Sequence, residues 1–561
     1  MEKRLLLAAA LSIAVLLAWD AIAPKPPKPA PTASAPPPPV AVVPPPATAA
    51  STSSAPGAAG SSAPAAPPAV EVVPVAAASQ TTVTIERPLY RAVLDNRGGL
   101  LTSFVLKRYN DDSGHPLDIV HRSDAPERPL WLDFGADAEA TRAANGSLYE
   151  VERSADKGAD VVRLRYAGNG RSFEKTLTFS DGYVVGVRVS CRGTKLPFAV
   201  TLGPGLRNLS DAERENRFTN ASGAVYFDGE KAHAVARQKI ESVQQGPLPK
   251  SGFVGLEDNY FLTALVPRQD SQWWLAPVRE TQGGKKEEQV RAGAVATSDL
   301  DASLYLGPKD LDVMAALGLH LEETVSFRTM GVNLSWIAKA LIWLLKAAHR
   351  YIPNWGVAIL IVTFLVRLVL FPLVQKSFVG MKKMQKLQPK INVIRDKYKK
   401  AKMDVEQRNK MNQEMMALYS AEGYNPMSGC LPMLLQMPVL LSFYVILQHS
   451  IELRHAPFVF WIHDLSARDP TYILLVLMIG SMFVQQLMTP STVDAAQRKL
   501  FLMMPLFWGF FMKDMPAGLV LYWLFSNVLT IGQQALINRM YRDDPAPARS
   551  RKKPNVGKTR G

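Results

Sequence analysis

Five apolar segments near the end of the chain constrain its fold more than any other feature. They occupy roughly residues 354–374, 431–449, 471–488, 500–512 and 517–537. A helix that crosses the ~30 Å hydrocarbon core of a bilayer needs ~20 consecutive apolar residues, and most of these segments approach that length. The segments therefore predict a polytopic α-helical membrane protein.

Lysine and arginine are distributed unevenly around these segments, and the distribution predicts their orientation. Residues 375–429 hold twelve of them, 450–470 hold two, and the tail after residue 538 is strongly basic. Positive loops stay in the cytoplasm. We therefore expect 375–429, 489–499 and the C-terminus to be cytoplasmic, and the domain before the first span to be periplasmic. The net charge of +15 fits this placement.

The N-terminus allows two interpretations. Lys3 and Arg4 precede the apolar stretch Leu5–Ala18, and Ala21–Ala23 resembles a cleavage site, as in a signal peptide. An uncleaved anchor over residues 1–23 is the alternative. Both place the N-terminus inside and export the segment after residue 23. Residues 24–80 are rich in Pro and Ala and predict a disordered periplasmic tether, because they cannot bury enough apolar surface to order the chain.

Residues 81–330 have a different pattern, with short alternating runs such as TVTIE, VVRLRYAG and YVVGVRVSC between turn residues. Period-two alternation predicts an antiparallel all-β sandwich. The histidines His115, His121 and His233 lack metal-ligand spacing, so we interpret them as surface or internally satisfied residues. We expect no catalytic residue, no cofactor and no metal, and thus no enzyme. Cys191 lies in this polar region and Cys430 at the start of an apolar segment, so we expect no disulfide between them.

Residues 331–350 predict an amphipathic helix that precedes the first span. Its apolar residues recur at helical spacing: Leu334, Ile337, Ala338, Leu341, Ile342 and Leu345. Trp336 and Trp343 suit a membrane interface. Two placements remain open for this helix, along the bilayer surface or packed onto the sandwich.

Arg367 stands inside the first apolar segment. It lies twelve residues after Trp355, or ~18 Å along a helix, which is past the midplane on the cytoplasmic side. An arginine there costs ~2.5–3.5 kcal/mol on insertion scales. None of the five segments contains an Asp or Glu that could pair with it.

Water could reach Arg367 if polar side chains line a groove between the helices. Candidates for that lining are Thr363, Gln436, Ser442, Gln485, Gln486, Ser526, Asn527, Gln533 and Gln534. The alternative is an arginine that extends to the interface beside ordinary helix–helix hydrogen bonds. The absence of acidic residues in the segments disfavours a proton- or sodium-coupled transporter, and the chain has no phosphate-binding loop for ATP.

Three further segments allow paired interpretations. Residues 500–512 are short for a span and contain Pro505, so they either thin the bilayer or extend through the flanking Arg498 and Lys513. Residues 375–429 predict a cytoplasmic helical hairpin whose methionines either contact varied partners or form its core. The basic tail, residues 539–561, suits ribosomal RNA, anionic lipid or a topology signal.

Longer motifs resemble a known family. TFLVRLVLFPL around Arg367, YNPMSGCLPMLLQMPVLLSFY before and into the second segment, and MPAGLVLYWLFSN in the last are similar to the YidC/Oxa/Alb membrane protein insertases. GLEDNYFLTALVP and LYLGPKDLDVM in the sandwich resemble the Gram-negative type with a large periplasmic domain. The similarity covers all but the tether and the extreme tail.

The resemblance implies six transmembrane helices: a retained N-terminal anchor and a five-helix insertase core over residues 351–538. It implies a multi-pass protein of the bacterial inner membrane that inserts and folds nascent membrane proteins, alone or with the Sec translocon. The groove arginine would attract polar or acidic client segments, and Met437 and Tyr522 match client-contacting positions. The expected groove residues are Thr363, Arg367, Gln436, Met437, Tyr522 and Ser526. Expected partners are clients, Sec components, lipid and the ribosome.

Two other classes of function remain open from the residues. An anion transporter or channel would use Arg367 as its binding site. A structural scaffold for an envelope complex would bind through the sandwich and would not need Arg367.

Overall fold

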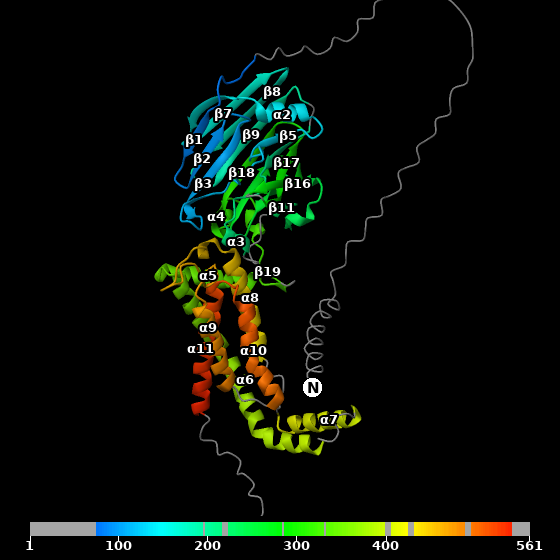
Figure 1. Ribbon diagram of the computed structural model, residues 1–561, viewed down its shortest axis with the longest axis vertical. Helices are drawn as coiled ribbons and strands as arrows, with labels where there is room; N and C mark the ends of the chain where they lie inside the picture. The colour runs from blue at the N-terminus through cyan, green and yellow to red at the C-terminus, as the bar shows by residue number, and fades with distance from the viewer. Residues whose placement is uncertain are drawn as a thin grey trace, which may run out of the picture. The chain divides into compact units, whose positions relative to one another are not determined.

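The computed structural model describes residues 74–194, 197–215, 223–282, 285–329, 332–398, 405–423, 431–488 and 495–540. The expected N-terminal anchor, nearly all of the tether, the tail beyond residue 540 and Cys430 lie outside these ranges. A β-rich region comes first along the chain and a helical region comes second, as the colours of Figure 1 show.

Three antiparallel sheets form the β-rich region. The first has the order β1 (Thr82–Glu86), β2 (Tyr90–Asp95), β3 (Leu100–Asn110) and β4 (Pro116–Asp118). The second has the order β13 (Gln244–Leu248), β16 (Ser271–Gln282), β17 (Lys285–Ala296), β10 (Phe198–Leu202) and β5 (Trp131–Asp133).

The third sheet is the largest. Its order is β12 (Ala232–Val235), β11 (Gly223–Phe227), β14 (Phe253–Glu257), β15 (Phe261–Pro267), β18 (Leu300–Pro308), β9 (Val184–Arg192), β8 (Arg171–Phe179), β7 (Ala159–Gly168) and β6 (Glu150–Asp156). A two-stranded ribbon, β19 (Arg328–Thr329) with β20 (Val332–Asn333), ends the β region.

Alternating burial along the strands explains why these sequences pack as sheets. Phe173, Lys175, Leu177 and Phe179 of β8 are buried, and the residues that alternate with them, Glu174, Thr176 and Thr178, are half-buried. One continuous apolar core joins side chains from all three sheets. The antiparallel pattern predicted from the sequence is therefore confirmed.

Short helices between the strands were not predicted. They are α2 (Ala138–Gly146), α3 (Asp211–Glu215), α4 (Leu311–Ala316) and the 3₁₀ turns η1 (Arg237–Lys239) and η2 (Leu321–Thr324). Asp137 caps α2 by accepting a hydrogen bond from the Ala140 amide at 2.9 Å. Asp310 caps α4 in the same way. These helices have only three to nine residues each, too few for periodicity to reveal them.

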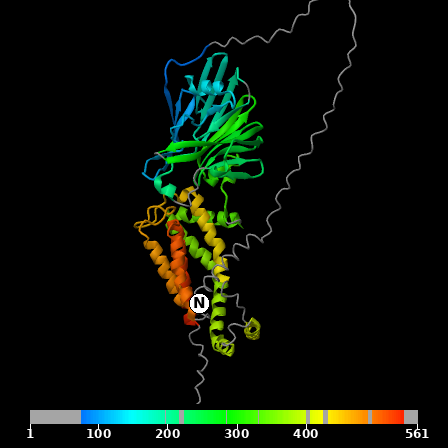
Figure 2. The same cartoon turned by 45° about the vertical axis from the view of Figure 1, so that its right-hand side comes forward.

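The helical region contains α5 (Ser335–Tyr351), α6 (Trp355–Lys397), α7 (Val405–Ala421), α8 (Leu431–His449), η5 (Ile451–Leu453), α9 (Ile473–Met488), α10 (Ala495–Met512) and α11 (Ala517–Met540). Two helical stretches are long and apolar enough to cross a membrane, Trp355–Lys382 and Ala517–Met540. Three shorter apolar stretches lie in α8, α9 and α10. Figure 2 shows α6 and α11 from a second direction.

Helix α5 forms where the amphipathic pattern predicted it. Ala338, Leu341 and Leu345 are buried in a core shared with α6 and α8. Trp336 and Trp343 are 76% and 69% exposed. The apolar face of α5 therefore packs on the apolar helices, and its tryptophans remain available for a lipid interface.

The helical hairpin expected over residues 375–429 is not a separate unit. Helix α6 continues from the first apolar segment through Pro372 and Pro389 to Lys397 without a break. Met384, Leu387 and Ile391 of α6 form a small core with Met415, Leu418 and Tyr419 of α7. The methionines Met384 and Met415 are thus core residues of the hairpin, which was the plainer of the two interpretations.

Helix α10 is longer than the apolar segment that predicted it. It begins at Ala495, five residues before Leu500, and so includes Arg498 and Lys499. The interpretation in which the span extends beyond residues 500–512 is therefore correct at the N-terminal side, where the helix includes Arg498. It is not correct at the C-terminal side, because the helix ends at Met512, before Lys513.

Candidate functional site

Arg367 lies on α6, whose start is fixed by a side-chain cap. Asn354 accepts a hydrogen bond from the Val357 amide at 3.0 Å, and its own amide group donates to the Phe458 carbonyl at 3.0 Å. From this capped start the helix runs for three turns to Arg367. The arginine side chain is half-buried.

The Arg367 guanidinium hydrogen-bonds to a serine on the last helix. Its Nε donates to Ser526 Oγ at 3.0 Å, and one terminal nitrogen donates to the same oxygen. Ser526 is buried on α11. Two residues 159 positions apart in sequence are thus brought into contact.

Helix α8 adds a third side chain to this contact. Gln436 Nε2 donates to the Tyr522 hydroxyl and lies 3.4 Å from Ser526 Oγ. The Tyr522 ring is buried and stacks on Phe443 with ring centroids 4.4 Å apart. Arg367, Gln436, Tyr522 and Ser526 therefore form one cluster of polar groups from three helices, which we call the arginine cluster.

Two predicted groove residues lie outside this hydrogen-bonded set. Thr363 is 1% exposed, and its hydroxyl donates to the Ile359 carbonyl of its own helix at 2.6 Å. Met437 is half-buried on α8 next to Gln436. Adjacent residues on a helix point ~100° apart, so Met437 lies on a different side of α8 from the cluster.

The charge of Arg367 has no acidic partner among the described residues. Its hydrogen bonds there go to a neutral serine hydroxyl. A charged group removed from water and not paired is energetically unfavourable. The arginine cluster can therefore offer charge-assisted hydrogen bonds to an incoming anionic or polar group, since a guanidinium carries five N–H donors.

Further along α11, a buried polar stripe faces the neighbouring helices. Its members are Ser526, Asn527, Thr530, Gln533 and Gln534. Asn527 Nδ2 donates to Ser481 Oγ on α9 at 3.0 Å, and Gln533 Nε2 donates to the Phe371 carbonyl on α6 at 3.3 Å. Part of the predicted groove lining thus serves helix–helix contacts.

Other members of the predicted lining have local roles or point outward. The Ser442 hydroxyl is buried and donates to the Pro438 carbonyl of its own helix at 2.8 Å. Gln485 is half-buried and Gln486 is exposed. Thr530 and Ser481 were not predicted, although Thr530 is four residues after Ser526 and so shares its helical face.

The outward faces of these helices are apolar. Leu368 and Val369 adjoin Arg367 in sequence and are exposed, as are Phe507 and Phe510 on α10. Large exposed apolar side chains around an internal polar cluster are typical of helices that face lipid. The Arg367 charge therefore lies among polar side chains, between helices whose outward faces carry exposed apolar residues.

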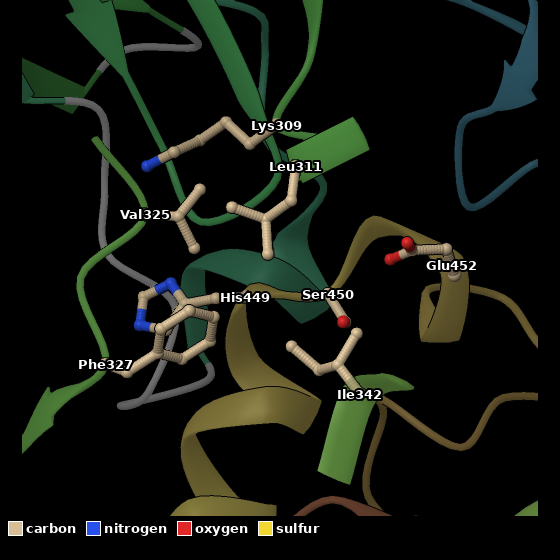
Figure 3. Close-up of a pocket in the computed structure, with 8 residues that line it drawn as sticks. All are labelled: Lys309, Leu311, Val325, Phe327, Ile342, His449, Ser450 and Glu452. Atoms are coloured by element: carbon tan, nitrogen blue, oxygen red, sulfur yellow. The ribbon is translucent and has the colours of Figure 1, made fainter. Parts of the chain in front are cut away.

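A small cavity lies where the end of α8 approaches residues of the β-rich region (Figure 3). It is lined by Lys309, Leu311, Val325, Phe327, Ile342, His449, Ser450 and Glu452, and its volume of about 10 Å³ suits a single water molecule. Lys309 Nζ is 2.9 Å from Glu257 Oε2. This cavity is too small for a ligand.

The three histidines are surface or satisfied residues, as the sequence predicted: His115 is exposed, and His121 and His233 each have an acidic partner. His121 Nε2 lies 2.6 Å from Glu280 Oε1 in the buried core, and His233 Nε2 lies 2.6 Å from Asp228 Oδ2. Across the described ranges, no group of three or more His, Cys, Asp or Glu side chains could hold a metal ion. Cys191 is buried as a free thiol.

Comparison with known proteins finds relatives of one kind for both the β-rich and the helical region. A family model described as 60Kd inner membrane protein matches residues 347–544, and one described as YidC periplasmic domain matches residues 82–344. Proteins named membrane protein insertase YidC from Citrifermentans bemidjiense and Geobacter metallireducens are 35% and 36% identical over 563 and 564 residues. They cover 97% and 96% of this chain and are themselves covered to 100% and 98%.

A solved structure described as an active YidC insertase with the first transmembrane domain resolved also aligns. It is 19% identical, with a TM-score of 0.35, and the alignment covers 82% of this chain and 94% of that chain.

Proposed function

The chain belongs to the YidC family of membrane protein insertases, and we propose that it inserts and folds client membrane proteins through a hydrophilic intramembrane groove centred on Arg367. Members of this family are inner-membrane proteins. The named relatives are insertases, and an insertase forms no covalent bond with its client, so we propose a non-enzymatic activity.

The observation that carries this proposal is the arginine cluster. Arg367 bonds a neutral hydroxyl, and no carboxylate pairs with it in the described part of the chain. A fixed acidic partner would compete with a client for the guanidinium. An arginine held by a weak neutral acceptor can exchange that bond for one to a client carboxylate or backbone carbonyl at little cost.

The client then leaves along an apolar route. Tyr522 belongs to the cluster on α11, Met437 follows Gln436 on α8, and exposed side chains such as Leu368 and Phe507 continue toward lipid. Burial of client apolar surface in the bilayer supplies the free energy, at about 25 cal/mol per Å². Thr363 and Gln436 complete the groove on the α6 and α8 sides.

Topology and partners form part of the same proposal. We propose six spans, the sixth being the N-terminal segment, with the sandwich in the periplasm and the C-terminus in the cytoplasm. The hairpin of α6 and α7 and the basic tail would meet the ribosome or anionic lipid, and the Sec translocon would act beside the protein on larger clients.

The test is complementation of a strain depleted of this protein. Arg367→Ala is expected to leave single- and double-span clients with acidic outer segments uninserted, and Arg367→Lys to retain much of the activity because it keeps the positive charge. Arg539→Ala is the matched control, since it removes an exposed arginine from the end of α11.

Normal insertion of these clients in the depleted strain would refute the insertase proposal. Normal insertion by Arg367→Ala, with the protein present at wild-type level, would refute only the role of the cluster. An anion flux into proteoliposomes that Arg367→Ala abolishes would favour a channel instead.

A further inference from the structure

We propose that an open cavity in the β-sandwich, with a volume of about 420 Å³, binds a small organic ligand that carries a carboxylate or phosphate group. The proposal concerns the sandwich alone and does not depend on the arginine cluster. The volume of the cavity falls within the ~300–1,000 Å³ range of ligand pockets.

Three separate segments of the sandwich build this cavity. Asp95, Arg97 and Thr102 come from the end of β2 and the start of β3, Arg128 and Trp131 from the approach to β5, and Arg142 and Asn145 from α2. Asn145 holds the last two segments together. Its side chain donates to the Leu132 carbonyl at 2.7 Å and accepts from the Leu132 amide at 2.9 Å.

Positive charge dominates the cavity wall. Three arginines, Arg97, Arg128 and Arg142, line the cavity, and Asp95 is the one acidic residue among its lining residues. None of the three arginines has a carboxylate within 4.0 Å among the residues the structure describes. Elsewhere in the sandwich arginines do lie beside acids; Arg171, for example, contacts Asp137 and Glu139 at the other end of α2.

The Asp95 carboxylate already accepts hydrogen bonds from other groups. The Asp95 carboxylate accepts from Gln80 Nε2 at 2.6 Å and from the Arg97 amide at 2.8 Å. It is therefore held in the β2–β3 turn and does not neutralise the guanidinium groups.

One arginine is pre-oriented by backbone contacts. Arg128 donates from Nη1 to the Ala125 and Glu127 carbonyls at 2.6 Å each, and from Nη2 to the Ser123 carbonyl at 2.9 Å. Burial lowers the pKa of Arg128, which means that its surroundings disfavour the charge. A bound anion would offset that cost.

Trp131 and Leu100 add apolar surface to the same wall. Guanidinium groups recognise the planar or tetrahedral oxyanion, while the apolar faces of Trp131 and Leu100 suit the body of the ligand.

The experiment is calorimetric titration of the full-length protein in detergent at low salt. Citrate tests the carboxylate arm, glycerol 3-phosphate the phosphate arm, and glycerol the uncharged control. Binding of one or both anions, with no heat from glycerol, is the expected result. The double variant Arg97→Gln/Arg142→Gln should weaken binding at least tenfold, because both side chains are exposed and make no ion pair that folding needs.

Arg279→Gln is the matched control, an exposed arginine on β16 outside the cavity. Trp131→Ala removes the ring against which the body of the ligand would pack and should weaken binding several-fold. Equal weakening by Arg279→Gln, unchanged binding by the double variant, or no binding of either anion would overturn the proposal. Binding of an acidic peptide alone would overturn the assignment to a small ligand.

Discussion

At the scale of single residues, Ser526 is the acceptor that holds Arg367. We predict that Ser526→Ala lowers the free energy of unfolding by about 1–3 kcal/mol, because the guanidinium loses its acceptor and Gln436 loses a neighbour. Ser442→Ala is the matched control, a buried serine whose hydroxyl bonds only within its own helix. Thermal denaturation in detergent measures both, and equal effects would contradict the prediction.

Lys175 gives the sandwich a pH-dependent stability. It is fully buried, and its Nζ donates to the Gly98 and Leu130 carbonyls at 2.6 Å each. Burial lowers the pKa of this amine to about 7. Between about pH 7 and the ordinary lysine pKa of 10.5, the unfolded chain therefore binds a proton that the folded chain does not, and stability rises with pH.

The measurement is the difference in melting temperature between the wild type and Lys175→Met as pH changes. The melting temperature of the wild type should rise relative to that of the variant from about pH 7 to about pH 9.5. The difference between the two melting temperatures should stay constant from about pH 5 to about pH 6.5. A difference that stays constant across the upper window would show that the folded amine keeps its proton.

Sequence alone could identify some of these residues but not their contacts. Arg367 could be predicted because it interrupts an apolar run, and Lys175 could have been found because it shares the inward parity of Phe173 and Leu177. Ser526 was one of nine polar candidates. Its pairing with Arg367 depends on how α6 and α11 rotate against each other, which helical periodicity does not fix.

At the scale of elements, a glycine sets how closely α6 approaches the loop before α9. A Cβ on Gly356 would lie 2.0 Å from Phe458 Cδ2 and 2.8 Å from Phe458 Cβ, so the ring cannot simply rotate away. We predict that Gly356→Ala destabilises the protein by about 1–3 kcal/mol through overpacking. The melting temperature of the purified protein measures this.

Gly480 provides the matched control for that substitution. It lies within α9, and a Cβ there would meet no atom within 4 Å. Gly480→Ala should be neutral or slightly stabilising, since alanine favours the helix. Comparable losses in both variants would mean that close approach at Phe458 is not the cause.

The elements that could be predicted are those with long periodic patterns. Helix α8 has the bounds that its apolar run gave, whereas α10 begins earlier, because helix formation continues through Arg498 and Lys499. The unbroken α6 could not be predicted, since each of its prolines ordinarily marks a helix end. Its tertiary packing on α7 and α11 offsets that preference.

At the scale of the whole described chain, a buried arginine joins the loop after α8 to the sandwich. Arg454 is 4% exposed, donates to the Asn110 carbonyl at 2.7 Å and lies 3.5 Å from Glu213. We predict that Arg454→Met costs about 3 kcal/mol, because removing one partner leaves buried acceptors unsatisfied. Limited proteolysis of the loop should become faster.

Arg468→Met is the control for this prediction. Arg468 lies in the same loop between α8 and α9, is exposed and makes no ion pair among the described residues. Its substitution should leave the proteolysis rate unchanged. Equal sensitivity in the two variants would mean that general loss of positive charge, not the buried contact, loosens the loop.

The division into a β-rich region and a helical region could be predicted from the hydrophobic pattern alone. Apolar residues recur at every second position in the first region and form long runs in the second. The contacts of Arg454 could not, since Asn110 lies 344 residues away in the sequence. Such pairings depend on the completed fold.

The polar stripe of α11 has a consequence for how this protein is itself made. Five buried polar side chains on one face make α11 a poor candidate to leave a translocation channel for lipid unaided. Because α11 follows α6 and α9 in the chain, these helices already offer hydrogen-bond partners when it emerges. The order of the helices along the gene thus protects the nascent chain, and a permuted gene that encoded α11 first would be expected to yield a protein dependent on another insertase.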